Sequence, residues 1–402
     1  MTIYNNIYIL SRTPISDNYI SVYGVWNFID KGFNVHLWDL TPIFDLDAEK
    51  DVAISDLSVN PAFRIFKTKE EFIHEIERLP KDALLIPHIT ISFESLWIYR
   101  LISKNSLDYA VCNIFSFPDF GIKGESLYKK GNLCFFLKKL IKNLTVRDIV
   151  NKFRSLFPGL FFCLTGIKPA NYFIAGGKKA LEYHSYCLDK STEICETHSF
   201  DYDVYLEEIA KDAFIFDSDM RYAVFLDQFL PFHPDRLYFE KFGIDPSMYY
   251  SSLSGFFDHL SDKLGIEIVI AAHPRADYDE KPDYFNGRKV IKGQTCRLVK
   301  NSEFVITHDS TTISYAVLYK KPIFFVGIGG MGDNRIKYIS SLASLFNQTI
   351  ICVGKYGDYN IDDTLKVDLN RYLKYEEEYI KRSGTPQKPL WDLFVQCINK
   401  NE

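Results

Sequence analysis

The stretch that decides the fold begins with residues 266–272, IEIVIAA, which run directly into His273-Pro274-Arg275. An apolar run of this length, in which Glu267 is the single charged residue, is typical of a strand that is buried on both faces of a sheet. The pattern returns at residues 303–308, EFVITH, which run into Asp309-Ser310-Thr311-Thr312. Helical patterns follow both motifs, and another apolar strand pattern starts at Ile323. Strands that alternate with helices over short connections predict an α/β fold with a parallel sheet.

The two polar motifs both follow strands, and ligands bind at the carboxyl ends of strands in such sheets. We therefore expect them to line one crevice. Ser310, Thr311 and Thr312 combine hydroxyls with the N–H groups of a helix start, which suits a phosphate. His273 adds a donor, and Arg275 adds a positive charge. Each motif also has a purely structural interpretation, as a helix cap or as a hydrogen-bonded strand end. Their occurrence at matching strand ends favours a binding site.

A resemblance appears in the same region. His-Pro at one strand end, followed by a Ser/Thr cluster before a helix and Lys321-Pro322, resembles the donor half of bacterial glycosyltransferases with two Rossmann-like domains (GT-B). In the relatives that use CMP-activated acids, the sialyltransferases and Kdo transferases, these motifs hold the nucleotide. The resemblance covers roughly residues 160–330 and implies two facing Rossmann-like domains with a cleft between them. The nucleotide-sugar-binding residues that it implies are Gln228, His273, Pro274, Arg275, Ser310, Thr311 and Thr312.

The chain has 402 residues, which is enough for two or more domains. We expect an acceptor-side domain at residues 1–200 and a nucleotide-sugar-binding domain at residues 201–370. Residues 371–402 are predicted to form terminal helices that pack back on the first domain. The first domain opens with a β-α-β pattern whose strand ends carry polar residues. The residues predicted to bind the acceptor are Ser11, Arg12 and His88.

Composition excludes several classes of protein. The net charge of −5 argues against a general nucleic-acid binder. The eight cysteines contain no Cys-x-x-Cys pair, which argues against a zinc ribbon or a redox motif. No apolar run is long enough to span a membrane, and the N-terminus lacks the pattern of a signal peptide. A cytoplasmic location with reduced thiols is the simplest interpretation.

Residues 134–157 form a basic amphipathic stretch. It is either a contact with an anionic inner-membrane surface, where lipid-linked acceptors are found, or a domain helix with a solvated basic face. A peripheral location at the inner membrane would follow from the first alternative.

Two carboxylates are predicted to be catalytic. Asp227 follows the apolar run 222–226 and, in a retaining reaction, would act as the nucleophile or stabilise the oxocarbenium ion. Its structural alternative is a turn cap. In an inverting reaction a base is needed, and Glu125 or His88 would supply it. No Asp-x-Asp cluster suits a metal ion, so we expect no metal and no cofactor beyond the donor.

The resemblance is strongest to the retaining β-Kdo transferases of capsule and O-antigen lipopolysaccharide synthesis, which implies CMP-Kdo as donor. The sequence lacks the acidic motif Asp/Glu-Asp/Glu-Gly of sialyltransferases, which counts against CMP-Neu5Ac. The implied acceptor is a saccharide or a lipid-linked glycan, and further glycosyltransferase modules are implied partners. Two other hypotheses stay open. One is a UDP-sugar transferase or epimerase, and the other is a sugar-nucleotide-binding module without enzymatic activity.

Overall fold

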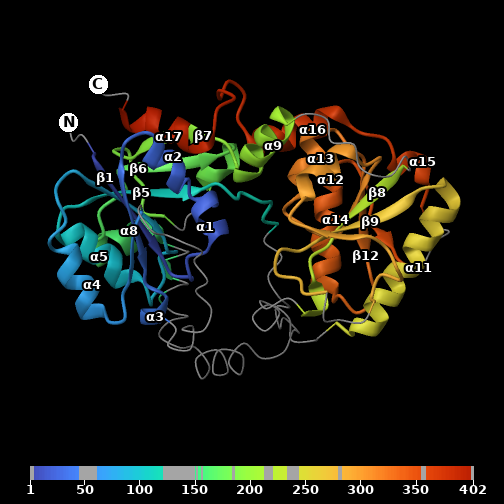
Figure 1. Ribbon diagram of the computed structural model, residues 1–402, viewed down its shortest axis with the longest axis horizontal. Coiled ribbons are helices and arrows are strands. Elements are labelled where there is room, and N and C mark those ends of the chain that lie inside the picture. Colours follow the sequence, from blue (N-terminus) through green and yellow to red (C-terminus); the bar gives the residue numbers. More distant parts are fainter. Residues whose placement is uncertain are drawn as a thin grey trace. The chain divides into compact units, whose positions relative to one another are not determined.

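The computed structural model divides the chain into two compact units, each built around a parallel sheet (Figure 1). The structure describes residues 4–44, 61–120, 150, 153–154, 157–182, 186–211, 221–232, 244–278, 283–354 and 359–399. The first unit consists of the described parts of Met1–Ile114, Tyr128–Phe200 and Gly384–Glu402. The second consists of the described parts of Phe115–Leu127 and Asp201–Ser383.

The first unit has a sheet of seven described strands in the order β3-β2-β1-β4-β5-β6-β7, and all pairs are parallel. The strand order reverses between β1 and β4, which is the switch point of a doubly wound sheet. The strands are β1 Asn6–Ser11, β2 Asn34–Asp39, β3 Ala62–Ile65, β4 Ala83–His88, β5 Asp108–Asn113, β6 Tyr172–Gly176 and β7 Glu193–Thr197.

Alternation along the strands of this unit produces two apolar layers. Tyr8 and Leu10 of β1 face one layer, whereas Ile7 and Ile9 face the other. Side chains of successive strand residues point to opposite faces, so helices must cover both sides. The helices on the first face are α4 Lys69–Ile76, α5 Leu96–Lys104 and α8 Pro158–Thr165. Those on the second face are α1 Asp17–Val22, α2 Val25–Asp30 and α17 Leu390–Asn399, and the unit also contains α3 Thr41–Phe44 and the 3-10 helix η2 Lys178–Glu182.

The second unit has six described strands in the order β10-β9-β8-β11-β12-β13, again parallel and again reversed at the first strand. They are β8 Tyr222–Leu226, β9 Glu267–Ala272, β10 Val290–Lys292, β11 Val305–Thr307, β12 Ile323–Gly327 and β13 Ile351–Cys352. The helices are α9 Phe200–Ala210, α11 Pro246–Leu264, α12 Thr295–Asn301, α13 Ile313–Leu318, α14 Asp333–Leu345, α15 Ile361–Thr364 and α16 Leu369–Tyr375, with η3 Leu230–Phe232 and η4 Glu376–Ile380. The α/β prediction with two Rossmann-like domains is confirmed.

Helix starts follow local capping chemistry. Thr68 and Glu71 form a capping box at the start of α4, and the Asp245 side chain accepts from Met248 N at the start of α11. Two short helices follow β1: Ser16 caps α1, and Gly24 in the left-handed region (φ +62°) separates α1 from α2.

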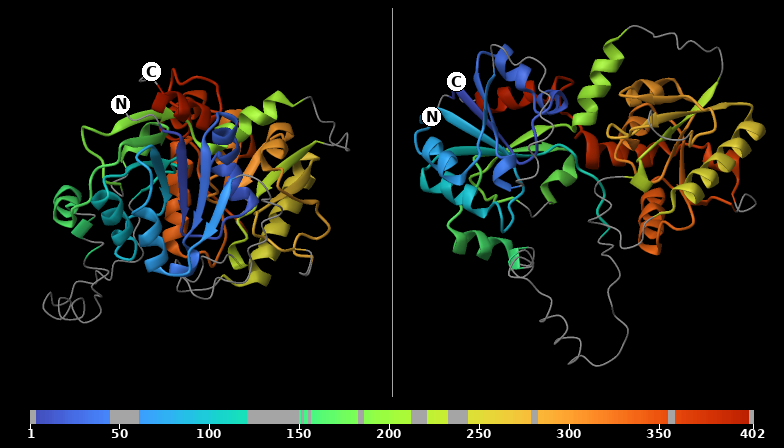
Figure 2. Two further views of the ribbon diagram at one scale, coloured as in Figure 1. Left: turned by 60° about the vertical axis from the view of Figure 1, so that its left-hand side comes forward. Right: turned by 60° about the horizontal axis from the view of Figure 1, so that its bottom comes forward.

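The end of the chain differs from the predicted arrangement. Residues 371–402 were expected to pack together on the first domain, but α16 and η4 bury Tyr372, Tyr375 and Ile380 in the core of the second unit. Of the described helices in this range, α17 alone lies against β7 and α2 of the first unit, and the red segment near the label C lies beside the blue strands in both views of Figure 2. Cys397 of α17 forms a disulfide with Cys195 of β7. The prediction of reduced thiols is therefore wrong for this pair in the structure.

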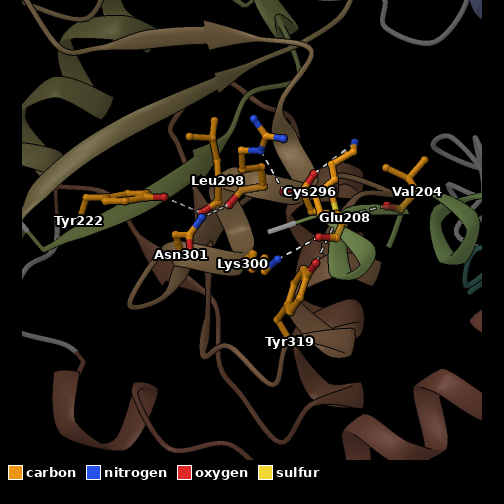
Figure 3. Close-up of polar contacts among 10 residues, drawn as sticks. Val204, Glu208, Tyr222, Cys296, Leu298, Lys300, Asn301 and Tyr319 are labelled. Atoms are coloured by element: carbon orange, nitrogen blue, oxygen red, sulfur yellow. Dashed lines mark hydrogen bonds and ion pairs between the residues drawn. The ribbon is translucent and has the colours of Figure 1, made fainter. Parts of the chain in front are cut away.

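Helix α9 is fixed to α12 by a partly buried polar cluster (Figure 3). Arg297 donates to Glu208 at 2.9 Å, and Lys300 donates to the Glu208 carbonyl at 2.9 Å. The Arg297 contact lowers the pKa of Glu208 against the opposing effect of burial, which is the larger single influence. Nearby, the Cys296 thiol lies 3.6 Å from the Tyr319 hydroxyl. These contacts place α9 in the second unit, directly after residue 200.

No helix among the described residues is long and apolar enough to cross a membrane. Most of the basic amphipathic stretch 134–157 lies outside the described residues, so its two interpretations both remain.

Candidate functional site

The carboxyl edge of the second sheet brings the predicted donor-site residues together. Strand β8 lies between β9 and β11, with Leu226 opposite Ala271 and Phe225 opposite Ile306. The residues that follow these three strands therefore emerge side by side at the switch point. They include Asp227 and Gln228 after β8, His273 after β9, and Ser310 in the loop after β11.

Asp227 and Gln228 tie the three loops together. The Asp227 carboxylate accepts from Phe229 N at 2.9 Å and, more weakly, from His273 N at 3.4 Å. It also accepts from the Tyr278 hydroxyl at 2.8 Å. The Gln228 side-chain oxygen accepts from Asp309 N at 3.2 Å. The end of β8 is thus hydrogen-bonded to the loops on both of its sides.

These contacts bear on the predicted role of Asp227. The residue is only 4% exposed, and burial raises the pKa of its carboxyl group against the lowering effect of its hydrogen bonds. Its three partners fit the turn-cap interpretation without excluding a chemical role. The catalytic assignment of Asp227 stays a prediction, and Glu125 lies outside the described residues.

The His-Pro-Arg loop fixes the tautomer of its histidine. Arg275 N donates to His273 Nδ1 at 3.1 Å, so a neutral imidazole carries its proton on Nε2 and can donate from there. Pro274 and Arg275 are exposed, and His273 is half-buried. The loop therefore presents one directed donor and one positive charge at the edge of the sheet.

The Ser/Thr loop is held from two directions. Ser310 Oγ and Thr312 Oγ1 are 2.8 Å apart, and Thr312 N donates to Ser310 Oγ at 3.4 Å. Asp309 pairs with Arg335 of α14 at 2.9 Å. Sequence reasoning did not select Arg335, although its position just after the glycine-rich segment 327–332 was a usable signal.

A buried histidine, His308, lies directly before this loop and is hydrogen-bonded on both ring nitrogens. His308 lies at the end of β11 with Nδ1 2.7 Å from Val326 O and Nε2 2.9 Å from the hydroxyl of Tyr249. A carbonyl can only accept, so Nδ1 carries the proton and Nε2 accepts from the tyrosine. Burial lowers the pKa of His308 to about 4, which keeps the ring neutral. This pair joins α11, β11 and β12 beneath the candidate site.

A cavity of about 590 Å³ lies on the β9–β10 side of the His-Pro-Arg loop. Its lining residues are Ala272, Arg275, Ala276, Asp277, Tyr278, Asp283, Tyr284, Phe285, Val290 and Lys292. The cavity therefore shares Arg275 with the candidate donor site and adds aromatic rings beside it.

The residues predicted to bind the acceptor lie in the first unit. Ser11 ends β1 and pairs in register with His88 at the end of β4, so two of the three are adjacent. Arg12 follows Ser11, and its guanidinium stacks on the Phe44 ring at 4.8 Å. Among the described residues, no group of three or more His, Cys, Asp or Glu side chains gathers in a way that could hold a metal ion.

Comparisons with known proteins give matches only among solved structures. No family model and no curated protein matches this chain. The wall teichoic acid polymerase TagF is 14% identical with a TM-score of 0.51, covering 100% of this chain and 91% of that one. The UDP complex of MnaA from S. aureus is 12% identical with a TM-score of 0.49, covering 98% and 95%. The UDP-GlcNAc 2-epimerase from Methanocaldococcus jannaschii is 12% identical with a TM-score of 0.45, covering 97% and 98%. At such identity the likeness to TagF shows the fold alone, and the chain has the architecture of two Rossmann-like domains that this polymerase shares.

Proposed function

We propose that this chain is a glycosyltransferase whose donor is a sugar activated by CMP. The observation that carries the proposal is the convergence of three linked loops at the switch point of the second sheet, where parallel α/β sheets bind their ligands. The hydrogen bonds of Asp227 and Gln228 hold these loops together without help from a ligand group. Such preorganisation lowers the cost of arranging donors around a ligand.

The donors at this edge suit one phosphate. His273 supplies an Nε2 proton, Arg275 supplies a charge, and the Ser/Thr loop supplies hydroxyls. Negative charge on the phosphate grows as the bond between the sugar carbon and the phosphate oxygen breaks, so fixed donors favour the transition state. The oxygen of the acceptor hydroxyl forms the new bond, and its proton passes to a base or to the leaving phosphate. This account requires no metal ion.

The finer proposal is CMP-Kdo as donor and a saccharide of a bacterial surface polysaccharide, free or lipid-linked, as acceptor. The motif resemblance supports CMP-Kdo as the donor. The fold shared with the wall teichoic acid polymerase TagF is compatible with the synthesis of a surface polymer. Asp227 is the proposed nucleophile or cation stabiliser, and Glu125 or His88 is the base of an inverting alternative. Ser11, Arg12 and His88 are the proposed acceptor contacts. We place the reaction in the cytoplasm, at the inner-membrane surface if the acceptor is lipid-linked.

A nucleotide panel tests the donor site. The thermal unfolding midpoint is measured with CMP, UMP, UDP, GDP and ADP, since binding to the folded state raises it by mass action. CMP is expected to give the largest shift. His273→Ala should weaken CMP binding by roughly 1.5–3 kcal/mol, the scale of a hydrogen bond to a charged group. The matched control is His74→Ala on α4 of the first unit, which removes an exposed histidine and should leave the shift intact. A larger shift with UDP would replace the CMP proposal by the UDP-sugar transferase or epimerase.

Turnover separates an enzyme from a binding module. CMP release from CMP-Kdo is followed with and without a saccharide acceptor, in the presence and absence of EDTA. Acceptor-dependent release that EDTA leaves unchanged is the expected result. Nucleotide binding without release would favour the non-enzymatic module, and activity that EDTA abolishes and magnesium restores would contradict the metal-free account.

A further inference from the structure

Helix α8 of the first unit is apolar on its exposed side as well as on its buried side. Its sequence, PGLFFCLT, contains no charged residue. Phe161 and Phe162 pack into the core of the unit. Leu160 and Leu164, by contrast, are 53% and 70% exposed, and Phe157, which precedes the helix, is 54% exposed. Helices that are apolar all round are normally buried on every side, so the outer side of α8 is an unusual surface.

The exposed residues of α8 form one continuous surface. Phe157, Leu160 and Leu164 recur at helical spacing and therefore lie along one side of the helix. The Phe157 carbonyl accepts from Phe161 N at 2.9 Å, which joins Phe157 to the first turn. Cys163, an exposed free thiol, follows Leu160 by three residues on the same side. We call Phe157, Leu160, Cys163 and Leu164 the α8 face. Single exposed apolar residues are common on proteins, whereas a contiguous apolar patch marks a contact site.

Positive charge flanks the α8 face. Arg154 lies three residues before Phe157 and is half-buried, and its Nη1 atom has no hydrogen-bond partner. Lys168, just after the helix, is exposed. In the sequence from residue 129 to residue 168 Asp148 is the only acidic residue, and the basic residues are Lys129, Lys130, Lys138, Lys139, Lys142, Arg147, Lys152, Arg154 and Lys168. An apolar stripe bordered by cations is typical of a helix that lies in the headgroup layer of an anionic bilayer.

The size and chemistry of the α8 face favour a lipid surface over a protein partner. Each partner of a stable protein–protein complex buries about 800 Å². Three partly exposed large side chains and one thiol supply only part of that area. These side chains also lack strong hydrogen-bonding groups, whereas a protein interface has about one hydrogen bond per 100–200 Å². Binding to a bilayer needs neither, because apolar burial and attraction to anionic lipids add together.

We propose that the α8 face binds an anionic phospholipid bilayer, with Phe157, Leu160 and Leu164 inserted at the level of the headgroups and the flanking cations beside lipid phosphates. The proposal assigns to described residues a contact that the basic stretch 134–157 alone left open. It does not depend on the nature of the donor, because α8 belongs to the first unit and the candidate donor site to the second.

Vesicle flotation of the full chain tests this contact. Vesicles of phosphatidylglycerol and phosphatidylcholine should bind the chain, and pure phosphatidylcholine should bind it at least about 10-fold more weakly, because the flanking cations lose their attraction. The double variant Leu160→Gln, Leu164→Gln should lower binding to the anionic vesicles at least about 10-fold through lost apolar burial. The matched control is Leu369→Gln, Leu373→Gln on α16, where two leucines at the same spacing are 56% and 55% exposed. This control should bind like the wild type, and both double variants should keep the thermal unfolding midpoint.

Two native thiols supply a second measurement on the unmodified chain. Cys163 in the α8 face and Cys352 at the end of β13 are both exposed and free. Anionic vesicles should slow the reaction of Cys163 with a water-soluble maleimide several-fold and leave Cys352 unaffected, as followed by mass spectrometry of the labelled peptides.

The proposal is overturned if anionic vesicles do not bind the wild type, if both double variants or neither of them lose binding, or if vesicles protect the two thiols equally. Self-association that depends on Leu160 and Leu164, without vesicle binding, would assign the α8 face to a second copy of the chain and overturn the lipid proposal. The CMP shift separates this surface from the proposed function. Vesicle binding by a chain without a CMP shift would support the α8 face and reject the CMP-dependent transferase, and a CMP shift without vesicle binding would do the reverse.

Discussion

At the scale of single residues, Asp227 fits two interpretations, a catalytic carboxylate and a turn cap. Asp227 was selected from the sequence because it directly follows a buried strand, and the structure places it at the carboxyl end of β8. Its partners are two backbone N–H groups and the Tyr278 hydroxyl, which the sequence did not indicate. A carboxylate with these partners can hold a turn, and a group held so firmly is also well placed for chemistry.

Asp227→Asn separates the two roles. It keeps shape and removes charge, so transfer should fall at least ~10²-fold, the scale of a lost electrostatic group, while the CMP shift persists. Tyr278→Phe is the matched control, since it removes one hydrogen bond to Asp227 and leaves the charge in place. Release of CMP from CMP-Kdo measures both variants. Near wild-type transfer in Asp227→Asn, or equal small losses in both variants, would assign Asp227 to the turn alone.

Asp201, at the start of α9, predicts a pH dependence of stability. Burial raises the pKa of its carboxyl group to about 6, with hydrogen bonds to Ser314 and Tyr315 opposing the shift. An unfolded aspartate titrates near 3.9. The folded chain therefore binds this proton more tightly, and the stabilisation is present below about pH 4 and lost as the pH rises through about 6. The upper bound of this effect is about 3 kcal/mol.

Asp201→Asn should remove that dependence. The free energy of unfolding, measured in urea from pH 4 to pH 7, should increase relative to the wild type as the pH rises. Asp262→Asn on the exposed side of α11 is the control and should follow the wild type. A constant difference between Asp201→Asn and the wild type across this range would contradict the raised pKa.

At the scale of elements, helix α17 packs against the junction between α1 and α2. Trp391 of α17 is fully buried, and its Nε1 donates to Val22 O at 3.0 Å. The indole lies directly over Gly24, where a Cβ atom would come within 2.1 Å of the ring. Gly24 is thus required both for its positive φ and for the space that Trp391 occupies.

Gly24→Ala should destabilise the first unit by about 2–5 kcal/mol, because the left-handed conformation is strained and the indole must move. The matched control is Gly32→Ala, where φ is +89° and no atom lies within 4 Å of an added Cβ. That variant should lose only the cost of the backbone conformation, about 1–2 kcal/mol. Urea unfolding followed by tryptophan fluorescence measures both. Equal losses of stability in the two variants would show that the Trp391 indole can move aside at no cost in free energy.

At the scale of the whole molecule, the chain returns to its first unit after completing the second. The Cys195–Cys397 disulfide closes a loop of 202 residues between β7 and α17. A cross-link of this span reduces the entropy of the unfolded chain. It therefore connects the stability of the first unit to the presence of the last helix.

A reducing agent should lower the stability of the wild type by roughly 2–4 kcal/mol. The double variant Cys195→Ala, Cys397→Ala should be less stable than the wild type without reductant, and the reductant should not change its stability further. Cys163→Ala, which removes an exposed free thiol, should behave like the wild type. Thermal unfolding with and without reductant is the measurement, and thiol labelling of the unfolded chain that finds Cys195 and Cys397 free would contradict the pairing.

The sequence by itself determined the two parallel sheets and the positions of their polar strand ends. The apolar runs that became β8, β9 and β11 are local patterns, and His273 and Ser310 follow them directly. The convergence of these residues could be predicted because strand order in a doubly wound sheet obeys few rules. The N-terminal caps of α4 and α11 can also be predicted from the sequence, because a capping side chain and the N–H group it binds lie within one turn of helix.

Only the tertiary structure decided the contacts between residues far apart in the chain. The Tyr278 bond to Asp227 and the pairing of Arg335 with Asp309 depend on which loops meet, and no local pattern encodes that. The same holds for α16 and α17, two amphipathic helices that pack in different units. An apolar helix face indicates that burial is favourable, but which core it enters depends on the shape and free surface of each unit, and these exist only once both sheets have formed.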